Sequence, residues 1–125
     1  ETSAYIRKYL EKLGYEIVPI EPTGLIAELS SLRNREKLVV LRAEMDALPI
    51  QEQTNLPYAS VNQGCMHACG HDGHTAIQLI VAKILAQYRE KLPGNIVFFR
   101  SCSGSFLNLQ RRLVKVQKEC FRPEH

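Results

Sequence analysis

Residues 65–74, with the sequence CMHACGHDGH, combine two thiols, three imidazoles and a carboxylate in one short segment. The chain has four histidines, and three of them lie here. Thiolates and imidazoles bind borderline-soft cations such as zinc or manganese. Cys69 and His71 are separated by one glycine, so in an extended loop both side chains point the same way and can reach one ion. The segment therefore predicts a metal site around which the rest of the chain must fold.

Residues 65–74 are expected to lie where a loop meets a helix, because an apolar helical pattern begins directly after His74. Asp72 is expected to cap that helix. A single Cys or His is more often structural than a ligand, but six such groups in ten residues favour metal binding. The spacing does not match a zinc finger or ribbon, which needs two separated ligand pairs. Further ligands must therefore come from elsewhere in the fold.

The composition is that of one small globular domain. The chain has 125 residues, of which 45% are hydrophobic and 23% charged. No apolar run has the length of a membrane span, and no signal peptide is visible. Four cysteines without a secretory signal indicate reduced thiols and a cytoplasmic location. Because the sequence starts at Glu1 and not at methionine, we expect a processed or partial product.

The net charge of +3 is unevenly distributed. Residues 100–125 contain six Lys or Arg and two Glu, a balance of +4, which leaves −1 for residues 1–99. The basic character therefore belongs to the tail, and the main body is not expected to bind nucleic acid.

Apolar periodicity predicts helices that alternate with strands. The predicted helices span residues 2–13 and 74–90, and the predicted strands span 15–20, 25–29, 37–45 and 95–99. Thr2 and Gly14 are candidates for the two ends of the first helix. Leu38 to Leu41 form a continuous apolar run, which is typical of a strand buried on both faces. This order predicts an α/β fold with a mostly parallel sheet.

Two carboxylates follow the third predicted strand. Glu44 and Asp46 are two residues apart, so both are expected to point to the same side of the sheet. One could bind a metal, and the other could orient a ligand imidazole or thiolate. The alternative is that both are solvated loop acids. A long connection over residues 47–71 follows, and such loops are usually functional or contain unrecognised elements.

Three strings in this region resemble the M20 metallopeptidase/amidohydrolase superfamily. They are LRAEMDALPI (41–50), LPYAS (56–60) and MHACGHDGHTA (66–76). The similar branch contains hippurate hydrolases, N-acyl-amino-acid amidohydrolases and auxin-conjugate hydrolases. The resemblance runs over residues 1–99 and covers only the N-terminal part of a catalytic domain. It implies a partial three-layer, zinc-peptidase-like α/β domain.

The resemblance also implies an enzyme and a site. The family hydrolyses N-acyl-amino acids, which are small molecules with a linear amide bond, to a carboxylic acid and an amino acid, using two divalent ions, zinc or manganese. Cys69 and His71 match two metal ligands, and Asp46 matches the acid that orients the metal site. Glu44 stands where the branch usually has Asp. The motif contains three further polar residues without an assigned ligand role: His67, Asp72 and His74.

The similarity stops after residue 99. The family continues with a Gln-Pro-Ala-Glu-Glu string, in which the first Glu is the general base and the second a metal ligand. This chain has RSCSGS at 100–105 and no Glu-Glu pair anywhere. We therefore expect a truncated catalytic domain over residues 1–99, inactive in isolation, followed by an unrelated basic tail over 100–125. Such a change suggests a frameshift, alternative splicing or a damaged reading frame.

Two other functions remain open from the residues alone. The chain could be a non-catalytic metal- or thiol-binding module that uses Cys69 and His71. It could also be an interaction protein, because apolar residues at 106, 109, 113, 116 and 120 predict an amphipathic helix in the basic tail. Such a helix would more often simply cover exposed core. No membrane-spanning segment is expected, and the oligomeric state is not indicated.

Overall fold

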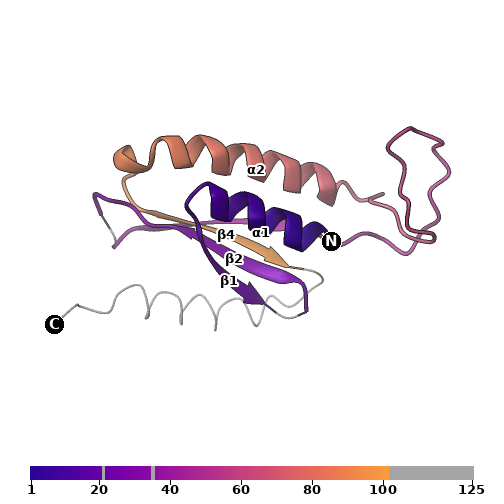
Figure 1. Ribbon diagram of the computed structural model, residues 1–125, viewed down its shortest axis with the longest axis horizontal. Helices are drawn as coiled ribbons and strands as arrows, with labels where there is room; N and C mark the ends of the chain where they lie inside the picture. The colour runs from indigo at the N-terminus through magenta and orange to yellow at the C-terminus, as the bar shows by residue number, and fades with distance from the viewer. Residues whose placement is uncertain (21, 35, 102–125) are drawn as a thin grey trace.

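The computed structural model describes residues 1–20, 22–34 and 36–101 (Figure 1). The elements follow the predicted order, with bounds that differ by a few residues. They are α1 (Thr2–Lys12), β1 (Glu16–Ile20), β2 (Gly24–Leu29), β3 (Leu38–Glu44), α2 (His71–Gln87), the 3-10 helix η1 (Arg89–Lys91) and β4 (Asn95–Ser101). None of the described helices is long and apolar enough to cross a membrane.

The four strands form one sheet in the order β1-β2-β4-β3. The α/β class is confirmed, but the expectation of a mostly parallel sheet is wrong for the described strands. β3 and β4 are parallel, whereas β4 and β1 each pair antiparallel with β2. The reason is the length of the connections: α2 lies in the long crossover between β3 and β4, while a short turn joins β1 to β2.

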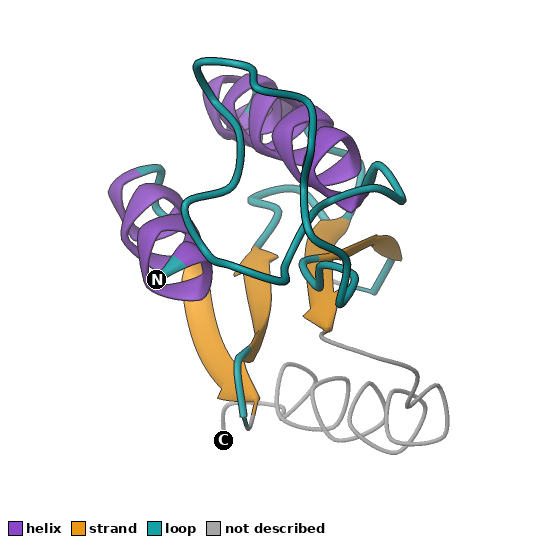
Figure 2. Cartoon of the chain, turned by 90° about the vertical axis from the view of Figure 1, so that its right-hand side faces the viewer, coloured by secondary structure: helices purple, strands orange, loops and turns teal. Residues whose placement is uncertain are grey.

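Both helices lie on one face of the sheet, so the described residues supply two of the three predicted layers (Figures 1 and 2). The core lies between the layers. It contains the buried side chains of Ile6, Leu10, Leu25, Ala27, Leu29, Ala82, Ile96 and Phe98. On the opposite face of the sheet, Ile26 and Val97 form a second, smaller buried cluster. The central pair β2 and β4 is therefore buried on both faces.

Tyr15, between α1 and β1, connects β4 with α2. Its ring packs edge-on against Phe98 of β4, with ring centroids 5.6 Å apart. Its hydroxyl donates a hydrogen bond of 3.0 Å to the carbonyl oxygen of Ala82 in α2. Burial raises the pKa of the Tyr15 phenol, so the hydroxyl keeps its proton and remains a donor.

The orientation of α2 differs from the simplest sequence expectation. The apolar stripe of this helix should face the core, but Ile77, Ile80 and Ile84 are 61%, 60% and 48% exposed. The buried residues of α2 are instead Thr75, Gln78 and Ala82, on the opposite side. Thr75 donates a hydrogen bond to β3, and the Ala82 carbonyl oxygen accepts one from Tyr15, so both bonds hold that side close to the sheet. Val81 and Leu85, at the border of the apolar stripe, still pack against the core.

β3 is also less buried than predicted. Val39 and Val40 are 51% and 37% exposed, although the run Leu38 to Leu41 predicted a strand buried on both faces. The cause is position, since β3 is an edge strand of the described sheet and has a neighbour on one side only.

The helix ends correct two capping predictions. α2 begins at His71, and its N-cap is Gly70 with a φ of +85°, a conformation that favours glycine. Asp72 is therefore in the first turn of the helix and is not its cap. The N-cap of α1 is Glu1 and not Thr2. The prediction that Gly14 ends α1 is supported by its φ of +84° just after the C-cap Leu13.

The start of β4 is tightly packed. The amide of Asn95 donates to the Lys37 carbonyl oxygen at 2.7 Å, and the Asn95 side-chain oxygen accepts from the buried Ser31 amide at 2.8 Å. The Ser31 hydroxyl donates to the Leu92 carbonyl oxygen at 2.7 Å. A Cβ atom at Gly94 would lie 2.6 Å from the Lys37 Cβ atom. Only glycine fits at residue 94 without a shift of its neighbours.

β4 includes residues 100 and 101, just beyond the expected end of the catalytic domain at residue 99. The expected amphipathic helix over 106–120 and most of the basic tail lie outside the described residues.

Candidate metal centre

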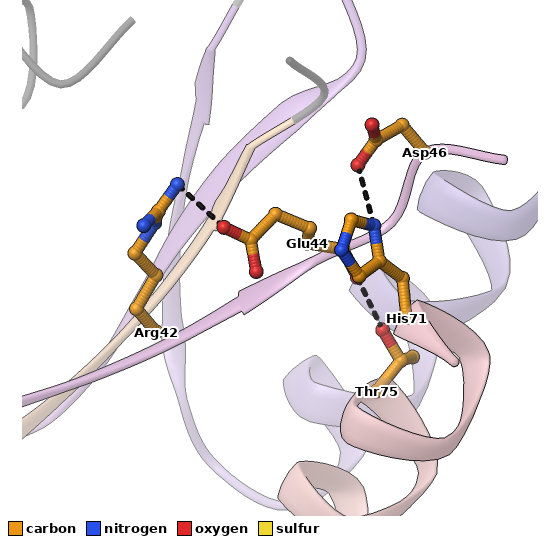
Figure 3. Close-up of polar contacts among 5 residues, drawn as sticks. All are labelled: Arg42, Glu44, Asp46, His71 and Thr75. Atoms are coloured by element: carbon orange, nitrogen blue, oxygen red, sulfur yellow. Dashed lines mark hydrogen bonds and ion pairs between the residues drawn. The ribbon is translucent and has the colours of Figure 1, made fainter. Parts of the chain in front are cut away.

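The centre of the candidate site is a contact between Asp46 and His71 (Figure 3). Asp46 follows the end of β3, and His71 is the first residue of α2. The Asp46 Oδ1 and His71 Nδ1 atoms are 3.0 Å apart, and both side chains are only partly exposed. A carboxylate at this distance favours the proton on Nδ1, which leaves the Nε2 lone pair free to bind a cation.

Glu44 does not join this pair, contrary to the expectation that Glu44 and Asp46 point to the same side. The Glu44 carboxylate pairs with the Arg42 guanidinium, while Asp46 reaches the His71 ring (Figure 3). The alternation of side chains applies only within a strand, and β3 ends at Glu44. The backbone of Glu44 does contact α2, because its carbonyl oxygen accepts a hydrogen bond of 3.0 Å from the Thr75 hydroxyl.

A two-residue bridge closes the long connection near its two ends. The Leu48 amide donates to the Met66 carbonyl oxygen at 2.8 Å, and the Met66 amide donates back to Leu48 at 3.0 Å. This bridge holds the segment after Asp46 beside the segment before His71. The connection therefore contains an unrecognised element, one of the two alternatives expected for a loop of this length.

The remaining expected ligands do not close around His71. Cys69 is an exposed free thiol. The ring of His74 is exposed, and its centroid lies 6.1 Å from that of His71. Within the described ranges, no group of three or more His, Cys, Asp or Glu side chains is placed to hold a metal ion. The donor types fit zinc, but the described residues supply only part of a coordination shell.

His67 and Asp72 line a cavity of about 300 Å³ between α1 and the start of α2. Tyr5, Met45 and Thr75 contribute to the same wall. The His67 Nδ1 atom is buried and has no hydrogen-bond partner in the described part of the chain. The structure thus separates the motif histidines by environment, with His67 in a cavity wall, His71 on a carboxylate and His74 toward solvent.

Glu52 organises the loop beyond the bridge. Its carboxylate accepts hydrogen bonds from the Thr54 hydroxyl and from the Ser60 amide, the latter at 2.7 Å. These two bonds lower the pKa of Glu52 below its usual value of 4.5, and desolvation and the negative charge of Asp72 offset only part of that shift. Because the pKa is lowered in the folded loop, these bonds are present above about pH 4.5 and are lost as the pH falls through the lowered value.

We expect the Ser60 amide proton resonance to report this titration. In a pH series followed by NMR, its chemical shift should change with a midpoint below 4.5, the usual Glu value. Glu52→Gln should remove the titration, because an amide carries no charge to lose. Glu90→Gln, a change to another exposed acid, should leave it intact. A midpoint at or above 4.5 would contradict the hydrogen bonds described here.

Sequence reasoning missed Thr75 and the Leu48–Met66 bridge. Thr75 lies four residues after His71, so both occupy the same face of α2. Once His71 is a candidate ligand, this four-residue spacing could have indicated that Thr75 lies beside it. The bridge pairs single residues 18 positions apart and has no periodic pattern that could reveal it.

Similarity to known proteins covers this whole region. The sequence model of peptidase family M20/M25/M40 matches residues 40–103, which is just over half of the chain. N-acetylcysteine deacetylase of Bacillus subtilis is 50% identical over 100 residues, which is 78% of this chain and 26% of that protein. Hippurate hydrolase of Campylobacter jejuni is 49% identical over 98 residues, 78% of this chain and 25% of that protein.

A solved structure agrees with these sequence matches. The Bacillus subtilis YXEP protein, described as a dinuclear metal-binding peptidase of the M20 family, superposes with a TM-score of 0.78 at 40% identity. The superposition covers 91% of this chain and 32% of that protein. The chain spans about a quarter of the length of the curated relatives it matches. The motif resemblance is confirmed, and the chain belongs to peptidase family M20/M25/M40.

Proposed function

We propose that this chain is the N-terminal, metal-binding part of a hydrolase that cleaves the amide bond of N-acyl-amino acids. The observation that carries the proposal is the Asp46–His71 contact within the segment matched by the family. Relatives named as a deacetylase, a hippurate hydrolase and an N-acyl-L-amino acid amidohydrolase support the reaction class. The substrate would be a small molecule with a linear amide bond and a free carboxylate.

Two residues would bind the metal. His71 would use Nε2, because Asp46 holds Nδ1, and Cys69 would contribute its exposed thiolate. A divalent zinc or manganese ion would supply Lewis acidity to the amide carbonyl and would acidify water. His67, Asp72 and His74 would support the surroundings of this site, and Glu44 would fix β3 to α2 through its carbonyl oxygen. The free thiols of Cys65 and Cys69 support a cytoplasmic location.

The position after β4 explains why the isolated chain should be inactive. β3 and β4 are parallel, and Glu44 is in register with Ser101, so both strands end at the same edge as Asp46. A carboxylate that follows β4 would face the site, as in the ligand-binding edge of α/β sheets. Residues 100–105 contain no carboxylate. The chain therefore lacks a proton acceptor at the position where this topology would place one.

Metal binding tests the first part of the proposal. In calorimetric titrations with zinc or manganese, Asp46→Asn should weaken binding by about 10- to 100-fold, because the Nδ1 proton of His71 loses its carboxylate. His71→Ala and Cys69→Ala should weaken it further. Glu11→Gln, which changes an exposed acid on α1, serves as the matched control and should have no effect. Equal affinity in wild type and His71→Ala would exclude this site.

Hydrolysis tests the second part. With added zinc or manganese, the chain should not turn over N-acetylcysteine or hippurate measurably, since loss of general-base assistance alone lowers rates by about 10²–10⁴-fold. Metal binding without turnover would also agree with the non-catalytic metal- or thiol-binding alternative, which the exposed Cys69 favours. Turnover that disappears in Cys69→Ala would contradict the expected inactivity.

A further inference from the structure

The backbone around Asp46 is attached to other segments of the chain on both sides. Two residues before Asp46, the Glu44 carbonyl oxygen accepts a hydrogen bond of 3.0 Å from the Thr75 hydroxyl (Figure 3). Two residues after Asp46, Leu48 forms the two-bond bridge to Met66. The Asp46 carboxylate is therefore placed by two attachments, each only two residues away from it.

The two attachments differ in the groups that form them. The Leu48–Met66 bridge consists of backbone groups alone, so any residues except proline could form it. The attachment at Glu44 depends on one side chain, because the Thr75 hydroxyl is the donor. A residue without a hydroxyl at position 75 would leave the bridge intact and would remove only this attachment.

Thr75 is placed to transmit this attachment to the Asp46–His71 contact. It lies four residues after His71, about one helical turn along the same face of α2, and its side chain is buried against the sheet. Asp46 follows the accepting carbonyl by two residues, and its Oδ1 atom is 3.0 Å from the His71 Nδ1 atom. A shift of the end of β3 relative to the first turns of α2 would therefore change the distance between these two atoms.

We propose that Thr75 is a positioning residue of the candidate metal centre. Its hydroxyl fixes the end of β3 to α2, so that the Asp46 carboxylate stays on Nδ1 of His71 and the Nε2 lone pair stays available to a cation. Thr75 acts through the Glu44 backbone and not as a ligand. The proposal rests on the proposed function for the use of His71 as a ligand, but the geometry that it concerns exists without a metal.

Tyr15 offers a matched control on the same helix. Its hydroxyl donates a hydrogen bond of 3.0 Å to the Ala82 carbonyl oxygen, which is the length of the Thr75–Glu44 bond. Ala82 lies two turns beyond Thr75, which is about 10 Å along α2. Tyr15→Phe and Thr75→Val each remove one hydroxyl with little change of shape. Both variants lose a hydrogen bond to α2, but only Thr75→Val loses it beside the candidate metal centre.

The first experiment needs no metal. Nitrogen-15 NMR of the metal-free 125-residue chain, at a pH where imidazole is neutral, reports which ring nitrogen of His71 carries the proton. Wild type and Tyr15→Phe should have the proton on Nδ1. Thr75→Val should show a mixture of the two tautomers, and Thr75→Ser, which keeps the hydroxyl, should restore the wild-type signal. His71→Ala assigns the resonances.

The second experiment measures the zinc affinity of the same variants by calorimetry. Thr75→Val should weaken binding by about 2- to 10-fold, the factor that corresponds to the net loss of one hydrogen bond. The effect should be smaller than that of Asp46→Asn, because the carboxylate is still present. Thr75→Ser and Tyr15→Phe should bind as tightly as wild type. If circular dichroism shows that Thr75→Val does not fold, Thr75→Ala provides the same comparison with Thr75→Ser.

The outcomes separate positioning from the proposed function. Mixed His71 tautomers in Thr75→Val alone support positioning, and absence of zinc binding by the wild type would then contradict only the proposed function. Positioning is overturned if the His71 ring and the zinc affinity of Thr75→Val match those of wild type. It is also overturned if Tyr15→Phe has equal effects, since any loosening of α2 would then suffice. Failure of Thr75→Ser to restore the wild-type values would likewise contradict a role of the hydroxyl.

Discussion

Replacing Phe98 by alanine should lower the free energy of unfolding by about 3–5 kcal/mol, the range typical of a fully buried aromatic residue. Phe98 has no exposed surface and lies at the centre of the core between the sheet and both helices. The change removes apolar burial and leaves a cavity beside Leu25 and Ala27, and it also removes the edge contact with Tyr15. Urea unfolding followed by circular dichroism measures the difference.

The matched control for Phe98→Ala is Val39→Ala on the adjacent strand β3. Val39 is half exposed, so its truncation should lower stability by less than about 1 kcal/mol. If Phe98→Ala leaves too little stability for a folded baseline, Phe98→Leu should show a smaller loss of about 1–2 kcal/mol. Equal effects of the alanine changes at residues 98 and 39 would contradict the central position of β4 and the edge position of β3.

Gly94→Ala should destabilise the chain by about 1–3 kcal/mol, although it adds only one methyl group. The new Cβ atom would meet the Lys37 Cβ atom at 2.6 Å and the Lys37 carbonyl oxygen at 2.7 Å. The Lys37 carbonyl oxygen is a backbone atom, and it also accepts a hydrogen bond from the Asn95 amide. A shift of residue 37 that relieves the clash would therefore disturb the start of β4. Thermal and urea unfolding measure the loss.

Gly73→Ala is the control with the opposite expected sign. Gly73 lies inside α2, where nothing approaches an added Cβ atom within 4 Å. Alanine there should raise stability by up to about 1 kcal/mol, because it restricts the unfolded chain and favours helix. Stabilisation by both changes would contradict the close approach of β4 and residue 37.

The sequence predicted the order of helices and strands because each has a clear period in its apolar residues. It did not predict the order of strands in the sheet, since β4 is last in the chain but lies between β2 and β3. Periodicity was right only in part at α2, where Val81 and Leu85 pack against the core but Ile77, Ile80 and Ile84 are exposed. An apolar pattern shows that a helix has an apolar face, but it does not show which side of the helix packs against the sheet.

The candidate site was predicted in part. Family resemblance and the end of a strand placed Asp46 near the His71 motif, and the structure brings the two side chains to 3.0 Å. The pairing of Glu44 with Arg42 was missed because strand alternation was extended past the last residue of β3. The metal-binding roles of Cys69 and His71 stay predictions, as they depend on groups that the described residues do not bring together.

The strand order has a consequence for synthesis on the ribosome. β3 acquires its neighbour only when β4 has been made, and more than fifty residues separate the ends of the two strands. At about 5–20 residues per second, a nascent chain spends roughly 3–10 s with β3 unpaired after that strand is made. During that interval Val39 and Val40 lie on a strand without a paired neighbour, and such an unpaired apolar strand is prone to pair with other chains.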